Sequence, residues 1–191
     1  MKVIIIGLTY GNRPKDIIFD NLNRCGYPHE YAEVNCEGIA NALNEGIDLM
    51  TGFDAIAFLA NDIIEPNGWL RKKVLALNEY PNAGIVASSI HQEQTKIQSE
   101  LIISNYLISR KTIETIGYFN EQMFPYGPID LDYCDRCHAA GISTYYVMNC
   151  HATHIGDHAT GNEYGWDKGR AISQTSQYSF TAGQPVYKAR L

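Results

Sequence analysis

The chain has 191 residues, which suits one domain or one domain with a short appendage. Hydrophobic residues make up 45% of it, enough for a single core. Its formal net charge of −6 disfavours nucleic acid as a partner, because that binding depends on Lys and Arg neutralising phosphates. We find no signal peptide and no apolar run near the roughly 18 residues of a transmembrane segment. We therefore expect a cytoplasmic protein whose five cysteines are reduced thiols.

The first half of the chain alternates apolar runs with segments of helical spacing. The predicted elements, in chain order, are a strand over 3–6, a helix that has Pro14 in its first turn and reaches Cys25, a strand over 31–34, a helix over 38–50, a strand over 55–59, a helix over 66–77 and a strand over 84–87. Such alternation predicts a parallel sheet with helices on its faces.

The second half is less regular. Its predicted elements are a strand over 101–108, a short helix over 112–116, a helix over 130–140, a strand over 144–148, a polar loop over 151–165 and a helix around 167–178. In open α/β sheets, ligands bind beyond the carboxyl ends of the strands. That rule directs attention to residues 8–10, to residues 61–62 and to the segment after Met148.

Asp62 stands at the end of the third predicted strand, and two isoleucines follow it. A carboxylate in such apolar surroundings is costly unless a positive group meets it. A divalent cation carrying phosphate oxygens is one such partner. The alternative is a cap on the helix that begins near Pro66, although Asn67 is better placed for that role. The position of Asp62 alone leaves both interpretations open.

Asp130 and Asp132 open a predicted helix, where unpaired N–H groups and the helix dipole favour carboxylates. Capping explains one of them. Two carboxylates within three residues, just after the Pro-Tyr-Gly-Pro turn at 125–128, are more than capping requires. One carboxylate is therefore a candidate general base for a substrate hydroxyl.

Histidines 151, 154 and 158 follow the last predicted strand. Their spacing would suit a metal site on a helix. Gly156 indicates a loop instead, which favours one histidine ligand over three. Nearby, the segment from Cys134 to His138 matches a c-type haem attachment motif and a redox dithiol by spacing. It lies inside a predicted helix with Cys137 on the buried side, which favours a structural role.

Five short blocks follow one another along residues 1–161. They are T-Y-G-N-R-P at 9–14, G-I-A-N-A-L-N-E-G at 38–46, F-L-A-N-D at 58–62 with W-L at 69–70, I-S-R-K at 108–111 with I-G-Y-F-N-E at 116–121, and D-L-D-Y-C-D-R at 130–136 with Gly141 and His154 after it. Each block is weak alone. In this order, they resemble the motifs of family 2 glycosyltransferases, which are inverting enzymes with the GT-A fold.

The resemblance implies a single GT-A-like, Rossmann-like α/β domain over 1–161, with a central, mostly parallel sheet flanked by helices. Residues 162–191 would form a C-terminal extension with one helix. The implied activity is metal-dependent transfer of a hexosyl or pentosyl group from a nucleoside-diphosphate-sugar to a hydroxyl acceptor. The implied cofactor is Mn²⁺ or Mg²⁺.

The resemblance also implies roles for single residues. The catalytic base would be Asp130, and the metal ligands would be Asp62 and His154. The nucleotide-sugar would contact Thr9, Tyr10, Asn12, Arg13, Asn35, Asn44, Asn61 and Asp62. The acceptor side or the active-site wall would include Trp69, Asp132 and Arg136.

The sequence departs from the family at three places. Ile129 replaces the glutamate before the base, and Ala60 replaces the first acid of the D-x-D motif. The family's aspartate-rich loop, which recognises the nucleobase of the donor, is missing after Asn35, so the donor's identity stays open. Two alternatives follow: a degenerate GT-A protein that binds a nucleotide or sugar without turnover, and a small metal-binding protein that uses His151, His154 and His158.

Overall fold

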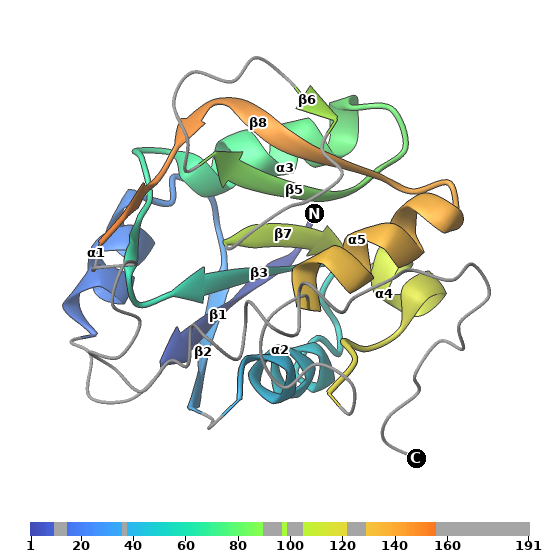
Figure 1. Ribbon diagram of the computed structural model, residues 1–191. Helices are drawn as coiled ribbons and strands as arrows, with labels where there is room; N and C mark the ends of the chain where they lie inside the picture. Colours follow the sequence, from blue (N-terminus) through green and yellow to red (C-terminus); the bar gives the residue numbers. More distant parts are fainter. Residues whose placement is uncertain (10–14, 36–37, 90–96, 99–104, 122–128, 156–191) are drawn as a thin grey trace.

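The computed structural model describes residues 1–9, 15–35, 38–89, 97–98, 105–121 and 129–155. Seven strands form one sheet in the order β2-β1-β3-β7-β5-β8-β6 (Figure 1). The strands are β1 (Val3–Thr9), β2 (Glu30–Asn35), β3 (Ala55–Ala60), β5 (Ala83–Ser89), β6 (Ile97–Gln98), β7 (Tyr106–Ser109) and β8 (Ser143–His151).

The sheet is mostly parallel, as predicted. β1 pairs in parallel with β2 and β3, and β5 pairs in parallel with β8. β7 lies between β3 and β5 and runs antiparallel to both, while β6 is antiparallel to β8. The two parallel groups therefore run in the same direction, and their carboxyl ends meet at one edge of the sheet.

Helices cover both faces of the sheet (Figure 1). They are α1 (Asp16–Arg24), α2 (Ile39–Asp48), α3 (Trp69–Glu79), α4 (Arg110–Ile116) and α5 (Ile129–Ala139). α1 and α3 contribute to one buried cluster, and α2, α4 and α5 contribute to the other. The predicted α/β architecture is thus confirmed.

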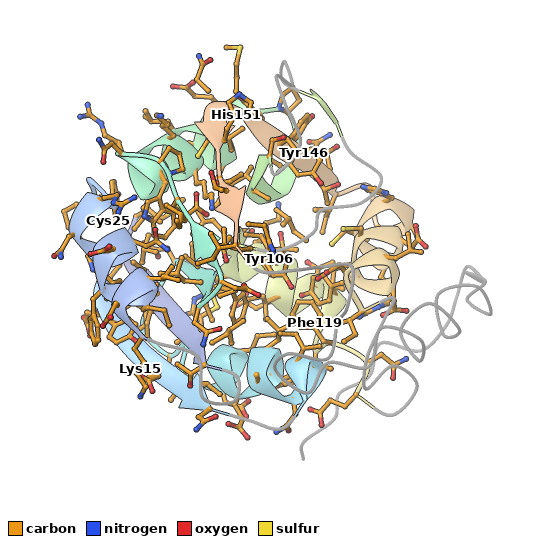
Figure 2. All side chains as sticks on the ribbon, turned by 60° about the vertical axis from the view of Figure 1, so that its left-hand side comes forward. Lys15, Cys25, Tyr106, Phe119, Tyr146 and His151 are labelled. Carbon is orange, nitrogen blue, oxygen red and sulfur yellow. The ribbon has the colours of Figure 1, made fainter. Side chains whose placement is uncertain are left out.

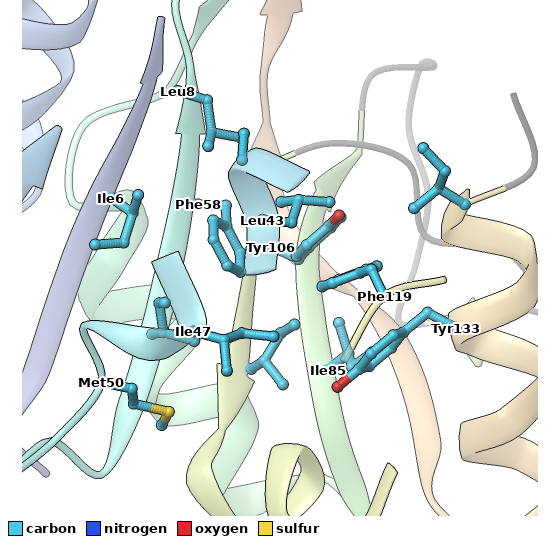
Figure 3. Close-up of a cluster of buried hydrophobic side chains, with 14 of the residues drawn as sticks. Ile6, Leu8, Leu43, Ile47, Met50, Phe58, Ile85, Tyr106, Phe119 and Tyr133 are labelled. Atoms are coloured by element: carbon cyan, nitrogen blue, oxygen red, sulfur yellow. The ribbon is translucent and has the colours of Figure 1, made fainter. Parts of the chain in front are cut away.

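Aromatic rings fill the core under α2 and α5 (Figure 3). The ring of Phe58 meets that of Tyr106 edge-on, with centroids 5.8 Å apart. Phe119 stacks on Tyr133 at 4.1 Å. Gly46 lets α2 approach this core, because a Cβ there would lie 2.6 Å from the Phe58 ring. The helix block with that glycine therefore has a packing role.

Three short strands were not predicted: β6, at the edge of the large sheet, and two that lie apart from it. β4 (Ile63–Ile64) and β9 (Thr153–His154) pair antiparallel in a separate two-stranded sheet. The start of the predicted polar loop over 151–165 is therefore strand, since β8 reaches His151 and β9 follows. α3 begins at Trp69 rather than Pro66, and its N-cap is Gly68 with φ 70°.

Three predictions fall beyond the described ranges. The helix around 167–178 and the extension over 162–191 lie outside them entirely, and so does the first part of the strand predicted over 101–108. Within the described part of the chain, no helix is long and apolar enough to cross a bilayer. The four cysteines described there are buried thiols: Cys25, Cys134, Cys137 and Cys150.

Candidate active site

The carboxyl edge of the sheet gathers several predicted site residues. Thr9, at the end of β1, is in register with Asn35, at the end of β2. Leu8 is in register with Ala60 at the end of β3, so Asn61 and Asp62 follow at the same edge. Asn35 is exposed and Thr9 is buried. The predicted contacts Tyr10, Asn12 and Arg13 lie outside the described residues.

Asp62 and His154 lie beside each other at this edge. Ile63 is in register with His154 across the β4–β9 pair, and the Ile155 backbone N–H donates to the Asp62 carbonyl over 2.7 Å. The distance between His154 Nε2 and Asp62 Oδ2 is 3.5 Å. Their side chains are 20% and 16% exposed, so a small ion can reach both. The two-stranded sheet is the element that positions this pair.

These two donors fit a divalent cation. Carboxylate oxygen suits Mg²⁺ and Mn²⁺, whereas imidazole suits transition metals, so the mixed pair fits Mn²⁺ better than Mg²⁺. Among residues 1–155 that the structure describes, no group of three His, Cys, Asp or Glu could hold a metal. The remaining ligands would therefore be waters and oxygens of a bound phosphate group. Asp62 is not the N-cap of α3, which is Gly68, and the first N–H groups of that helix donate to the carbonyls of Pro66 and Cys25.

A buried ion pair lies next to this edge of the sheet. Lys73 Nζ lies 2.8 Å from Glu65 Oε1, and both side chains are 0% exposed. Lys73 also donates to the carbonyl of Asn105, and Ser88 Oγ donates to the other oxygen of Glu65. The Glu65 backbone N–H donates to Asn21 Oδ1. This network joins α1, α3, β5 and the residue before β7 to the segment that follows Asp62.

Asp130 lies in the first turn of α5, as predicted, with the phenol of Tyr106 against it. Tyr106 Oη donates to Asp130 Oδ1 over 2.8 Å. Burial raises the pKa of Asp130 from 3.8 to about 6, although the Tyr106 hydrogen bond lowers it. Both residues border a cavity of about 10 Å³, enough for about one water, together with Phe119 and Tyr133. Such a carboxylate can take up a proton near neutral pH.

The start of β7 connects the two regions. Asn105 Oδ1 accepts a hydrogen bond from the Ala60 backbone N–H over 2.8 Å, at the end of β3. The next residue, Tyr106, holds Asp130. Figure 2 shows Tyr106 near the centre of the molecule, while His151 lies at its rim. Asn105 and Tyr106 were not predicted as site residues, because neither belongs to a quoted motif and their contacts are tertiary.

Asn44 does not fit the predicted nucleotide contact. Its side chain is fully buried and bridges α2 to the segment after α4. Asn44 Oδ1 accepts from the Phe119 backbone N–H, and Nδ2 donates to the Phe119 carbonyl and to Glu121 Oε1. All of its hydrogen-bonding groups therefore serve the fold.

Trp69, Asp132 and Arg136 do not fit the predicted acceptor wall. Trp69 is fully buried, and its indole N–H donates to the Asn21 carbonyl. Arg136 pairs with Asp132 along α5 at 2.8 Å, with side chains 8% and 1% exposed. Arg136 also donates to the Ile116 carbonyl, which ties α5 to α4. These are core residues rather than surface walls.

The two remaining motifs have structural explanations. Cys134 and Cys137 are buried on α5, and burial raises the pKa of the Cys137 thiol, so neither is placed for haem attachment. His151 is exposed and in register with Ser89, whereas His154 is in register with Ile63. His158 lies outside the described residues.

Solved structures share this architecture. A mutant of Drosophila β1,4-galactosyltransferase 7, in complex with manganese, UDP-Gal and xylobiose, matches with a TM-score of 0.65 at 16% identity, over 96% of this chain and 83% of that chain. A mannosyltransferase from Pyrobaculum calidifontis, in complex with GDP-Man and Mn²⁺, matches with 0.65 at 14% identity, over 84% of this chain and 59% of that chain.

Protein A197 from STIV matches with a TM-score of 0.62 at 18% identity, over 82% of this chain and 87% of that chain. No protein-family model and no curated protein sequence matches the chain. Sequence identities this low establish the fold and leave membership of family 2 a prediction. The chain has the GT-A-like fold of glycosyltransferases.

Proposed function

We propose that this protein is a metal-dependent, inverting glycosyltransferase that moves a sugar from a nucleoside-diphosphate-sugar to a hydroxyl acceptor. The observation that carries the proposal is the Asp62–His154 pair, 3.5 Å apart at the carboxyl edge of a GT-A-like sheet. The neighbouring galactosyltransferase and mannosyltransferase structures hold manganese with a nucleotide-sugar.

On the donor side, Asp62 and His154 would hold Mn²⁺ or Mg²⁺, and the ion would neutralise charge on the leaving diphosphate. Thr9, Asn35 and Asn61 end or follow the strands at the same edge, where the nucleotide-sugar would lie. Tyr10, Asn12 and Arg13 stay in the proposal from the family resemblance. The donor's base and sugar remain to be identified by the binding experiment below.

On the acceptor side, Asp130 would take the proton from the attacking hydroxyl. With a pKa of about 6, its carboxylate is mostly ionised near neutral pH and still basic enough to accept a proton. The Tyr106 hydrogen bond holds one carboxylate oxygen in place. A single base is sufficient for one in-line displacement, which inverts the configuration at the anomeric carbon.

A binding experiment tests the donor side. Wild-type protein is titrated with a panel of nucleotide-sugars, with and without Mn²⁺, by thermal shift and calorimetry. We expect one or more donors to bind only with metal, and Asp62→Asn or His154→Gln to weaken binding at least about tenfold. Asp20→Asn is the matched control, because the Asp20 side chain is exposed on α1. The absence of donor binding in wild type would overturn the proposal.

A product assay separates turnover from binding alone. Release of nucleoside diphosphate and transfer to a hydroxyl acceptor are followed in wild type and in Asp130→Asn. Transfer in wild type, lost in the variant while donor binding persists, supports an enzyme. Donor binding without transfer to any acceptor tested would favour the binding-only alternative. Stoichiometric zinc that His151→Gln removes would instead support a histidine-cluster metal site.

A further inference from the structure

Asn105 has an unusual backbone beside the candidate metal site. It lies one residue before β7, the residue is 3% exposed, and its φ is 42°. Among L residues, Asn and Asp adopt this left-handed region most readily, and Gly adopts it freely. The backbone therefore favours Asn, Asp or Gly at this position before any side-chain contact is considered.

Two contacts fix the orientation of Asn105. Its carbonyl accepts from Lys73 Nζ over 2.6 Å, and Lys73 is fully buried and paired with Glu65. Its side-chain Oδ1 accepts from the Ala60 backbone N–H over 2.8 Å. Only the oxygen of a carboxamide can accept a hydrogen bond, so the amide Nδ2 must face away from Ala60.

That amide Nδ2 is buried and has no hydrogen-bond partner in the protein as described. The same is true of Nδ2 of Asn61, a residue that is also 3% exposed. Native proteins pair nearly all buried polar groups, since an unpaired donor is costly. Two such donors adjoin the end of β3, next to Asp62. Among the described residues no acceptor pairs with either amide, and an oxygen of a bound ligand would supply one.

We propose that Asn105 is a donor-binding residue whose Nδ2 donates to an oxygen of the bound sugar diphosphate. This inference rests on the proposed function. Of the three residues that suit its backbone, only Asn both accepts from the Ala60 N–H and offers an amide donor. Asp would keep the acceptor and lose the donor, and Gly would lose both. The structural contacts of Asn105 use only its acceptor oxygen, its carbonyl and its backbone angle, so they do not account for the amide Nδ2.

The test compares Asn105→Asp and Asn105→Gly with wild type. The dissociation constants are measured by calorimetry, with Mn²⁺, for the nucleotide-sugar that binds wild type and for its free nucleoside diphosphate. We expect Asn105→Asp to weaken nucleotide-sugar binding more than tenfold and Asn105→Gly about tenfold. Weakening of both ligands assigns the phosphate oxygens, and weakening of the nucleotide-sugar alone assigns a sugar hydroxyl.

Asn82→Gly is the matched control. Asn82 is exposed and has φ 52°, so the substitution reports the effect of glycine at a left-handed position elsewhere. Asn105→Gly keeps the test decisive if the buried carboxylate of Asn105→Asp prevents folding. Dissociation constants within twofold of wild type in the folded Asn105 variants would overturn this inference and leave the proposed function intact. If wild type binds no nucleotide-sugar, the proposed function itself fails.

Discussion

Replacement of Asp130 by Asn tests the proposed base with a change of one atom. The carboxylate becomes a neutral amide of the same shape, and the amide oxygen can still accept from Tyr106 Oη, which lies 2.8 Å from Asp130 Oδ1. In the wild type, burial raises the pKa of Asp130 from 3.8 to about 6. The folded protein therefore favours the protonated carboxyl, and the ionised base weakens the fold.

The size of that effect follows from the shift. A rise from 3.8 to about 6 is worth at most roughly 3 kcal/mol, since each pKa unit corresponds to about 1.4 kcal/mol. Because the folded pKa is raised, the stabilising contribution of the neutral group is complete below about pH 4 and is lost as pH rises through about 6. Asp130→Asn keeps a neutral side chain throughout. The variant should therefore match wild type near pH 4 and exceed its stability by about 1–3 kcal/mol at pH 8.

Urea unfolding at several pH values measures this difference, and a product assay on the same samples measures transfer. We expect Asp130→Asn to be more stable at pH 8 and to lose transfer by roughly 10²–10⁴-fold, the usual contribution of a general base. Asp16→Asn is the control, because Asp16 also lies in the first turn of a helix but is exposed.

Two results would refute this reasoning. Full transfer by Asp130→Asn would show that another group takes the proton. If Asp130→Asn lost the same stability at low and high pH, ionisation of Asp130 would not destabilise the folded protein, which contradicts the raised pKa.

Three further predictions concern Tyr106, Lys73 and Asn44. Tyr106→Phe removes a hydrogen bond that lowers the pKa of Asp130, so the acid limb of the pH–rate profile should move to higher pH; an unmoved limb would contradict this. Lys73→Met leaves Glu65 buried without its cation and should cost about 3–5 kcal/mol in urea unfolding, while Lys73→Met with Glu65→Leu should recover much of it. Asn44→Ala leaves buried backbone groups unpaired and should cost about 2–4 kcal/mol, measured in the same way; a loss below 1 kcal/mol would count against the bridging role.

Local patterns were enough to predict the layers of the fold. β-branched runs and helical spacing are properties of a few neighbouring residues, and they place most strands and helices close to their observed bounds. The end of β1 shows the limit. The sequence predicts an end to the first strand before Gly7, yet β1 continues to Thr9 because it stays paired with β2 and β3. Gly7 instead makes room for Tyr31, since a Cβ there would lie 2.6 Å from Tyr31 Oη.

Direction and pairing were harder to predict. Residues 106–109 carry no pattern that predicts the antiparallel direction of β7. The direction of a strand depends on how the preceding connection brings the chain back to the sheet. β4 and β9 are too short to show any periodicity. The family resemblance, rather than pattern, brought Asp62 and His154 together before the structure placed them at 3.5 Å.

The misplaced site residues share one cause. Asn44, Trp69, Asp132 and Arg136 belong to family-like blocks, and such blocks mix residues that build the fold with residues that bind ligands. Their partners are a backbone amide, a carbonyl and each other, all within the protein. Only tertiary contacts reveal this, because a polar residue in a motif looks the same whether its partner is protein or substrate.

The two halves of the candidate site meet at the start of β7. Asn105 contacts Ala60, at the end of the strand that leads to Asp62, and Tyr106 contacts Asp130. Two adjacent residues therefore link the proposed metal ligand to the proposed base. The Lys73 ammonium, held by Glu65, fixes the backbone between them. In the proposed enzyme, this one buried network would then position both the donor side and the acceptor side. A change to Lys73 should therefore disturb donor binding and the pKa of Asp130 together, which independent supports for the two sides would not do.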